Sequence, residues 1–167
     1  PLDRANLRPD IVFEDFEQGY GDWKLEGEAF GPAPASGTLP DQQQVFGFVG
    51  KGVVNTYFRG DDTTGKLTSR TFSIERNYIR FLVGGGNHPT TQIRLLVDGD
   101  TVRAASGKNE ERLLPASWDV REFLGRRARI EIVDEQKGHW GHINVDQIEF
   151  TDLPGSVDTL DALDDLL

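Results

Sequence analysis

Short runs in which apolar and polar residues alternate recur along this chain of 167 residues, and they constrain its fold more than any other feature. Tyr78–Val83 and Thr91–Asp98 are clear examples, with an apolar residue at every second position. Such alternation is typical of strands with one buried face, because successive side chains of a strand point to opposite faces. About ten such runs, bounded by turn residues, with one short helical turn at 117–125, predict an all-β fold, an antiparallel β-sandwich of jelly-roll type.

The last of these runs changes the parity of its apolar residues part way along. Its inward-facing residues are Ile143 and Val145 in the first half, then Ile148 and Phe150 in the second. Because the side-chain period of a strand is two, this switch predicts a β-bulge at Asp146-Gln147. We expect the bulge to swing the Asp146 carboxylate towards the sheet edge, where it would suit a hard cation.

Turn signals and linkers set the expected domain boundaries. Asp98-Gly99 lies between two strand-like runs and predicts a two-residue hairpin with positive φ. Residues 1–10 are expected to form an N-terminal linker and residues 11–153 the sandwich. Residues 154–167 carry leucines at helical spacing among aspartates, which predicts an acidic linker or a short amphipathic helix. The chain starts at Pro1 without a leader-like segment, which indicates a processed product or an excised module.

Composition narrows the classes of function. The chain has no cysteine, so it has no disulfide framework, no thiolate zinc site and no cysteine nucleophile. Its formal net charge of −10 repels phosphate backbones and disfavours nucleic acid as a partner. No apolar run is long enough to predict a membrane span.

Several segments carry a resemblance to a known family. DFEQGYGDW, GKGVVNTY and SWDVREFLGRRARIEIVD contribute to it, and the most specific are GGGNHP (84–89) and WGHINVDQI (140–148). Together they resemble the accessory β-sandwich module found beside the catalytic domain of bacterial family-32 glycoside hydrolases, the levanases and other fructan-cleaving enzymes. The resemblance implies a non-catalytic, fructan-directed carbohydrate-binding module, secreted or on the cell surface, attached to an adjacent catalytic domain.

The resemblance also implies a metal site. Jelly-roll modules that bind sugars often join the first strand to the last through a structural calcium, held by an acid after an N-terminal Phe and by the aspartate of a Val-Asp-x-Ile sequence. The matching residues here are Glu17 and Asp146, and Asp15 is a further candidate ligand. Calcium takes six to eight oxygens, so backbone carbonyls would have to complete its shell. The alternative is that these acids are solvated or salt-bridged at a sheet edge.

A second set of residues is suited to a sugar. Aromatic rings stack on the C–H faces of sugars, while planar polar side chains bind the hydroxyls. The candidate ligand-binding residues are Trp140, His142, Asn87, His88, Asp134, Glu135 and Gln44. We expect the loops at 84–89 and 138–142 to meet on one rim of the sandwich. The alternative is that Trp140 caps the core and that the three glycines only shape a turn; Trp23 and Trp118 are predicted to be core residues.

Three functions therefore remain open. The first is a carbohydrate-binding accessory module, and the second is a structural sandwich that packs on a neighbouring catalytic domain. The third is an enzyme, which the sequence disfavours because it contains no Ser/His/Asp elbow, no HExxH motif and no phosphate-binding loop.

Overall fold

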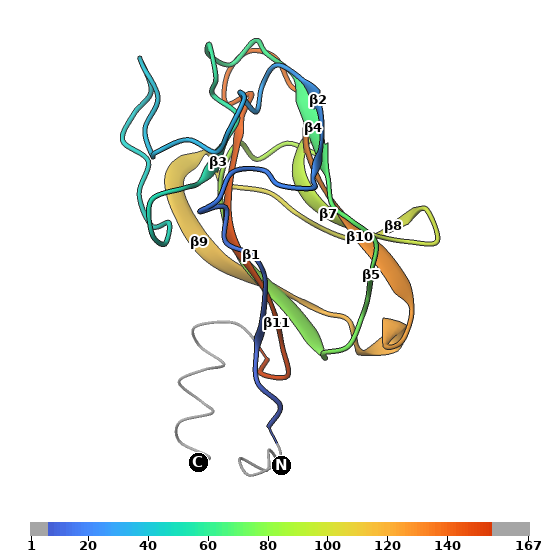
Figure 1. The fold of residues 1–167 in the computed structure, drawn as a ribbon. Coiled ribbons are helices and arrows are strands. Elements are labelled where there is room, and N and C mark those ends of the chain that lie inside the picture. The colour runs from blue at the N-terminus through green and yellow to red at the C-terminus, as the bar shows by residue number, and fades with distance from the viewer. Residues whose placement is uncertain (1–6, 155–167) are drawn as a thin grey trace.

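The computed structural model describes residues 7–154, and the regular secondary structure of these residues is almost entirely β (Figure 1). Among them, η2 (Arg121–Phe123) is a single short 3-10 helix. The strands, in chain order, are β1 (Ile11–Glu14), β2 (Lys24–Gly27), β3 (Val54–Asn55), β4 (Gly65–Thr68), β5 (Phe72–Ser73), β6 (Tyr78–Gly85), β7 (Thr91–Val97), β8 (Asp100–Ala105), β9 (Glu110–Asp119), β10 (Arg127–Asp134) and β11 (Ile143–Thr151).

The strands form two antiparallel sheets. One sheet has the order β1-β11-β6-β9, with β3 also paired to β11. The other has the order β2-β4-β10-β7-β8, with β5 also paired to β10. The main core lies between the sheets and contains large, fully buried side chains such as Phe81, Leu95 and Ile130. This arrangement confirms the predicted all-β sandwich.

Two local predictions are confirmed by the backbone. The register of β11 against β6 shifts between Asp146 and Glu149, and Gln147 has a φ of 53°, so the bulge lies where the parity switch placed it. Asp98 and Gly99 both have positive φ, 53° and 83°, as a primed two-residue turn between β7 and β8 requires. Trp23 and Trp118 are core residues, each 5% exposed.

The prediction that the Asp146 carboxylate points towards the sheet edge is wrong. Asp146 is fully buried within β11, and this strand is flanked by β6 on one side and by β1 and β3 on the other. Its Oδ2 accepts a hydrogen bond of 2.7 Å from the backbone N–H of Val49. The bulge therefore turns the carboxylate beneath the loop that contains Val49 and not towards a free sheet edge.

The segment before β3 covers the outer face of the sheet that contains β11. Val45 and Val53 pack there against Leu113 of β9 in a second, smaller core. The sequence also predicts short strands at 44–49 and 52–58, and this prediction is wrong apart from the two residues of β3. Val45 and Val53 are buried by packing on an existing sheet, and outside β3 the backbone there makes only isolated bridges, at Ala35 and Phe46.

The ten-residue strand β9 was not predicted. Pro115 lies in its middle, which is tolerated because β9 is at the edge of its sheet. The helical turn predicted at 117–125 is shorter than expected, because β9 extends to Asp119 and only η2 remains.

The start and end of the described chain lie side by side. Arg8 donates two hydrogen bonds, of 2.7 and 2.8 Å, to the carboxylate of Asp152 just after β11. The expected linker at 1–10 is described only from residue 7, and the predicted tail at 154–167 lies almost wholly outside the described residues.

Candidate functional site

The loop after β6 and the loop before β11 are in direct contact. The backbone N–H of Gly86 donates to the carbonyl of His142 at 2.8 Å, and the His88 ring Nε2 lies 3.1 Å from the carbonyl oxygen of His139. The two loops thus meet at one end of the sandwich, where β6 and β11 end and begin.

The three glycines of the first loop are needed for backbone packing. A Cβ atom at Gly84 would lie 2.8 Å from the carbonyl oxygen of Arg112, and one at Gly85 would lie 2.7 Å from that of His142. At Gly86 it would lie 2.1 Å from the carbonyl oxygen of Trp140. The three glycines therefore allow neighbouring strands and loops to pack closely. This agrees with the alternative that they shape the backbone and do not approach a ligand.

His142 lies at this end of the molecule and has hydrogen-bond partners at both ring nitrogens. Its Nδ1 lies 2.6 Å from Oδ1 of Asp61, and its Nε2 lies 2.6 Å from Oε1 of Glu111. Burial disfavours the charged ring, but the hydrogen bonds and negative charges of Glu111 and Asp61 outweigh it, so the pKa of His142 is raised. Two carboxylate partners favour an imidazolium that donates from both nitrogens.

Two aromatic rings flank this imidazolium. The Trp140 indole stacks on it with a centroid distance of 5.4 Å and an interplanar angle of 27°. The Tyr57 ring meets it edge-on at 5.2 Å. Trp140 is only partly buried and has a φ of 57°, a backbone conformation that residues other than glycine adopt at a cost. The contacts with His142 thus support a strained loop that presents an indole at the surface.

A cleft with a volume of about 210 Å³ opens beside these rings, and we call it the Trp140 cleft. It is lined by Asp41, Gln42, Gln43, Tyr57, Asp61, Glu111, His139, Trp140 and His142. Its charged and amide side chains are carboxylates, glutamines and histidines, with no lysine or arginine among these lining residues. The cleft therefore combines aromatic faces with an excess of hydrogen-bond acceptors.

Of the seven residues predicted to bind a sugar, the structure places Trp140 and His142 in this cleft. Asn87 lies outside it, where its backbone N–H donates to Asn109 and its Oδ1 accepts from Ser106. His88 also lies outside it, on the neighbouring loop. Gln44 and Glu135 are exposed side chains outside the lining.

Asp134 is buried inside the sandwich and not on the rim. It is fully inaccessible to solvent, and burial raises the pKa of its carboxyl to about 7. Its Oδ1 accepts a 3.3 Å hydrogen bond from the backbone of Gln136, while its Oδ2 has no partner among the described residues. Asp134 is therefore placed behind His142, out of reach of a ligand in the cleft.

Sequence reasoning missed most of the acceptors in the Trp140 cleft. The polar turn at 60–65 supplies Asp61, and the run of three glutamines supplies Gln42 and Gln43 in place of Gln44. Gln42 is held by two hydrogen bonds with Asn55, of 3.1 and 2.7 Å. These two polar segments were visible in the sequence, whereas Glu111 belongs to the strand that was not predicted.

The three candidate metal ligands lie near the 49–52 loop. Glu17 accepts hydrogen bonds from the backbone N–H groups of Lys51 at 2.8 Å and Gly52 at 2.6 Å. Asp15 accepts one from the backbone of Glu17 at 3.1 Å. Burial raises the pKa of Asp146 to about 7, and the negative charges of Glu17 and Asp15 add to this rise.

Two properties of these residues suit a cation: their negative charge, and one carboxylate oxygen without a hydrogen-bond partner. Oδ1 of Asp146 is buried without a hydrogen-bond partner, as an oxygen reserved for a cation would be. Among residues 7–154, however, no three His, Asp or Glu side chains are grouped closely enough to hold a metal by themselves. Any cation here would need backbone oxygens as additional ligands.

Comparison with known proteins supports the fold and points to a class of relatives. No known protein-family profile matches the chain. It is 48% identical over 149 residues to ecdE of Aspergillus rugulosus, which is named provisionally as a glycosyl hydrolase. The match includes 84% of this chain but 21% of that protein, so the chain spans about a fifth of its relative's length.

Two solved structures share the architecture. TmCBM61, determined in complex with β-1,4-galactotriose, is 17% identical with a TM-score of 0.52, and the match covers 82% of this chain and 94% of that one. The K3 cleaved adhesin domain of Lys-gingipain from Porphyromonas gingivalis is 14% identical with a TM-score of 0.54, covering 86% and 99%. In the described part of the chain, no helix is long and apolar enough to cross a membrane.

Proposed function

We propose that this chain is a non-catalytic carbohydrate-binding module that binds a neutral glycan in the Trp140 cleft. The observation that carries the proposal is the partly exposed Trp140 indole beside a set of carboxylate and amide acceptors. An indole offers a flat apolar face to the C–H groups of a sugar ring, and the acceptors suit hydroxyl donors. Asp41 and Gln43 are exposed side chains of this set and are placed to meet a ligand.

His142 supports the site and does not perform chemistry in it. A general base needs a ring nitrogen free to take a proton from a substrate. Both nitrogens of His142 are already bound to the carboxylates of Asp61 and Glu111. The ring instead acts as a fixed cationic surface beneath the Trp140 indole, a favourable arrangement for a cation and an aromatic face.

Fructan is the first glycan to test, and the module would act beside a catalytic domain in a secreted or cell-surface protein. This part of the proposal is supported by the resemblance of the GGGNHP and WGHINVDQI segments to accessory modules of fructan-cleaving enzymes. The much longer relative named as a glycosyl hydrolase supports the attachment to a further domain. A β-1,4-galactan is the second glycan, because TmCBM61 was determined with β-1,4-galactotriose.

The test is affinity gel electrophoresis with levan, inulin and β-1,4-galactan embedded in the gel. We expect retardation with one of them, at an affinity between about millimolar and micromolar, or about −4 to −8 kcal/mol, because the cleft is small and open. Trp140→Ala should abolish retardation, whereas Trp140→Phe should keep part of it. Gln44→Ala is the matched control, since this exposed side chain lies outside the cleft.

Circular dichroism must show that Trp140→Ala remains folded, because the indole also covers His142. A folded Trp140→Ala variant that is retarded as strongly as the parent would contradict the proposed site. Equal mobility of the parent protein in all three glycans and in a plain gel would contradict fructan and galactan as ligands.

We also propose a structural calcium beneath the 49–52 loop. Its side-chain ligands would be Asp146, through the unpartnered Oδ1, and Glu17, with Asp15 close by. When bound, the cation would neutralise the buried carboxylate and join the segment after β1 to the bulge of β11.

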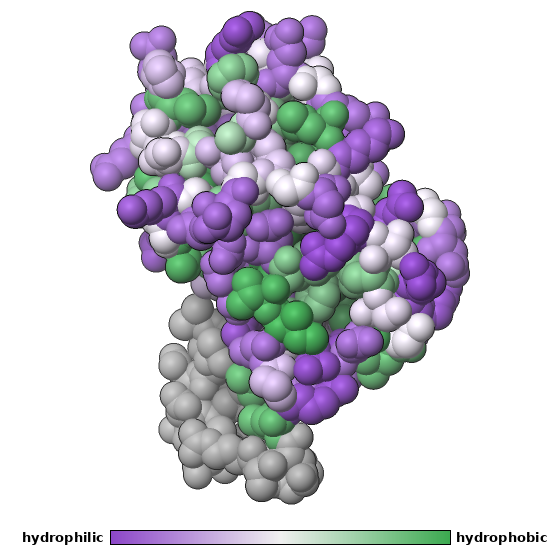
Figure 2. Space-filling view, viewed as in Figure 1, coloured by the Kyte–Doolittle hydropathy of each residue, from purple (hydrophilic) through white to green (hydrophobic). Residues whose placement is uncertain are grey.

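A purely structural module is the second candidate, and the exposed apolar side chains of one loop favour it. Phe46 and Val49 are 50% and 51% exposed on the segment that covers the β11 sheet. Figure 2 shows that the visible face is mainly hydrophilic, with separate apolar areas. If these side chains contact a neighbouring domain, Phe46→Ser should weaken that contact in the longer protein and leave glycan binding unchanged.

A further inference from the structure

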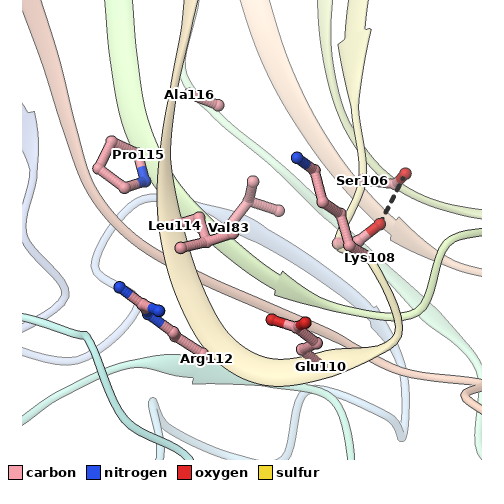
Figure 3. Close-up of a pocket in the computed structure, with 9 residues that line it drawn as sticks. Val83, Ser106, Lys108, Glu110, Arg112, Leu114, Pro115 and Ala116 are labelled. Atoms are coloured by element: carbon pink, nitrogen blue, oxygen red, sulfur yellow. Dashed lines mark hydrogen bonds between the residues drawn. The ribbon is translucent and has the colours of Figure 1, made fainter. Parts of the chain in front are cut away.

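A larger cavity of about 470 Å³ lies beside the edge strand β9, and we call it the β9 groove (Figure 3). It shares no lining residue with the Trp140 cleft. The two sites use alternate residues of one strand: Glu110 and Arg112 line the groove, whereas Glu111 lines the cleft. Because side chains alternate along a strand, the groove and the cleft lie on opposite faces of β9.

The floor of the groove is apolar. Val83 of β6 pairs with Leu114 of β9 and lies on the face of the sheet that points into the core. Leu114 and Ala116 lie on the same face but are only partly buried. Figure 3 shows Val83 and Leu114 between the side chains of Lys108 and Arg112. The sandwich therefore leaves part of its inner face accessible at this edge.

The rim of the groove carries two cations and one carboxylate, from Lys108, Arg112 and Glu110. All three side chains are exposed, and within residues 7–154 neither cation lies within ion-pair distance of a carboxylate. The groove thus has a net charge of +1 in a chain whose formal charge is −10. An unpaired arginine and lysine in an acidic protein offer an anion an attractive local field.

The loop that carries Lys108 is fixed by the GGGNHP segment. The backbone N–H of Asn109 donates to the carbonyl of Gly85 at 2.9 Å, and its side-chain Oδ1 accepts from the N–H of Asn87 at 2.8 Å. Gly107 packs so closely on Gly85 that a Cβ atom would lie 2.3 Å from the Gly85 carbonyl oxygen. The backbone at Lys108 is therefore fixed before any ligand binds, so that only the side chain has to be ordered on binding.

We propose that the β9 groove is a second glycan-binding site and that it takes an acidic sugar, a uronate residue. The guanidinium of Arg112 can bind a carboxylate through two parallel hydrogen bonds, and Lys108 adds a second positive charge. Glu110 is placed to accept from a sugar hydroxyl, and the ring C–H groups would lie on Leu114. The volume of the groove falls within the range of about 300–1,000 Å³ that is typical of small-molecule sites.

An acidic peptide is the competing occupant, and Pro115 disfavours it. A peptide would bind an exposed edge most readily as an added strand that hydrogen-bonds to the backbone. Pro115, in the middle of β9, has no N–H group and interrupts the regular backbone hydrogen bonding of the strand. A compact ligand held by side chains suits this edge better.

The experiment compares trigalacturonate with its methyl ester, which has the same rings without the charges. Titrations of the ¹⁵N-labelled protein should show trigalacturonate shifting amide signals at 106–116, with the ester binding at least tenfold more weakly. Arg112→Gln should weaken trigalacturonate binding about tenfold, as expected for losing one charged hydrogen-bonded pair. Lys108→Gln should weaken it less, because lysine provides a charge without a planar fork.

Lys137→Gln is the matched control, because it removes an exposed positive charge outside the groove, and it should not weaken binding. Trp140→Ala should leave trigalacturonate binding unchanged, which separates this proposal from the neutral-glycan site. Equal affinity for acid and ester, or unchanged affinity in Arg112→Gln, would overturn the proposal. So would signals confined to the Trp140 cleft, or shifts at 106–116 with hexa-aspartate but not with trigalacturonate.

Discussion

His142 is a buried ionisable side chain with two carboxylate partners. It is 3% exposed and bonded to Glu111, which is also buried, and to Asp61, which is partly exposed. A buried ion pair costs desolvation free energy, so its net contribution to stability is modest while it is complete. Removing one partner is different, because it leaves the other charges buried without compensation.

We therefore predict that His142→Phe lowers the free energy of unfolding by about 3 kcal/mol at pH 7. The new ring fills a similar space, but Asp61 and Glu111 lose their shared donor. Urea denaturation followed by fluorescence measures the change. His139→Phe is the matched control, since His139 is exposed and should change stability by less than about 0.5 kcal/mol. A loss as small in His142→Phe as in His139→Phe would mean that the ring is not charged in the folded protein.

The sequence predicted only two members of this group of side chains, those that are close together in the chain. Trp140 and His142 lie in one loop, so their side-chain chemistry and their place before a strand could be recognised together. Their partners come from elsewhere: Glu111 is 31 residues from His142 in the chain, and Asp61 is 81 residues away. Contacts of such separation depend on the sheet order, which local periodicity does not contain.

At the scale of elements, too, the features that depend on local sequence could be predicted, and those that depend on tertiary packing could not. The bulge in β11 could be located to the residue because a change of parity is a local property of one strand. The strand β9 could not be predicted in this way. A proline such as Pro115 argues against a strand unless the strand is known to lie at the edge of a sheet. The 44–58 segment has strand-like apolar residues, yet its Val45 and Val53 are buried by packing on the outer face of a sheet.

The proposed calcium would join the segment after β1 to the bulge of β11. Excess calcium should raise the midpoint temperature of unfolding relative to chelator, because a ligand that binds only the folded state stabilises it by mass action. Asp146→Asn should remove this difference, since Oδ1 of Asp146 is the one unpartnered buried oxygen of the set. Asp100→Asn, which changes an exposed carboxylate of β8, should retain it. Identical melting curves of the parent protein with calcium and with chelator would count against the site.

At the scale of the whole molecule, the fold class followed from the spacing of apolar residues and turns, and the proposed class of function from a resemblance in several segments. The ligand did not follow, because three charged residues that distinguish the Trp140 cleft from the β9 groove are consecutive residues of β9. Glu111 faces one site while Glu110 and Arg112 face the other. A shift of register by a single residue would exchange them.

The buried titratable groups of the molecule predict how its stability depends on pH. The pKa of Asp134 is raised by burial to about 7, and that of His142 is raised by its two carboxylates against the effect of burial. In both cases the folded state binds protons more tightly than the unfolded state, in which the pKa values are about 4 and 6.5. Stability from Asp134 is therefore complete below about pH 4 and decreases up to about pH 7, and that from His142 decreases above about pH 6.5.

Acids at the surface act in the opposite direction at lower pH. Hydrogen bonds from the Arg121 side chain lower the pKa of Asp119 to about 2, and the Arg8 side chain lowers that of Asp152. These contributions are present above about pH 4 and are lost as the pH falls through the lowered values. The two trends together place the stability maximum at about pH 4.

We therefore predict that the free energy of unfolding, measured by urea denaturation in chelator, decreases steadily from about pH 5 to about pH 8. Asp134→Asn should reduce this decrease between about pH 5 and pH 7, because the amide carries no charge at any pH and removes one of two buried ionisations, the other being that of Asp146. Glu135→Gln is the matched control: it removes the adjacent exposed carboxylate and should leave the slope unchanged. Stability that rises from pH 5 to pH 8 in the parent protein, or an Asp134→Asn variant with the parent's slope, would show that Asp134 ionises at its ordinary pKa in the folded state.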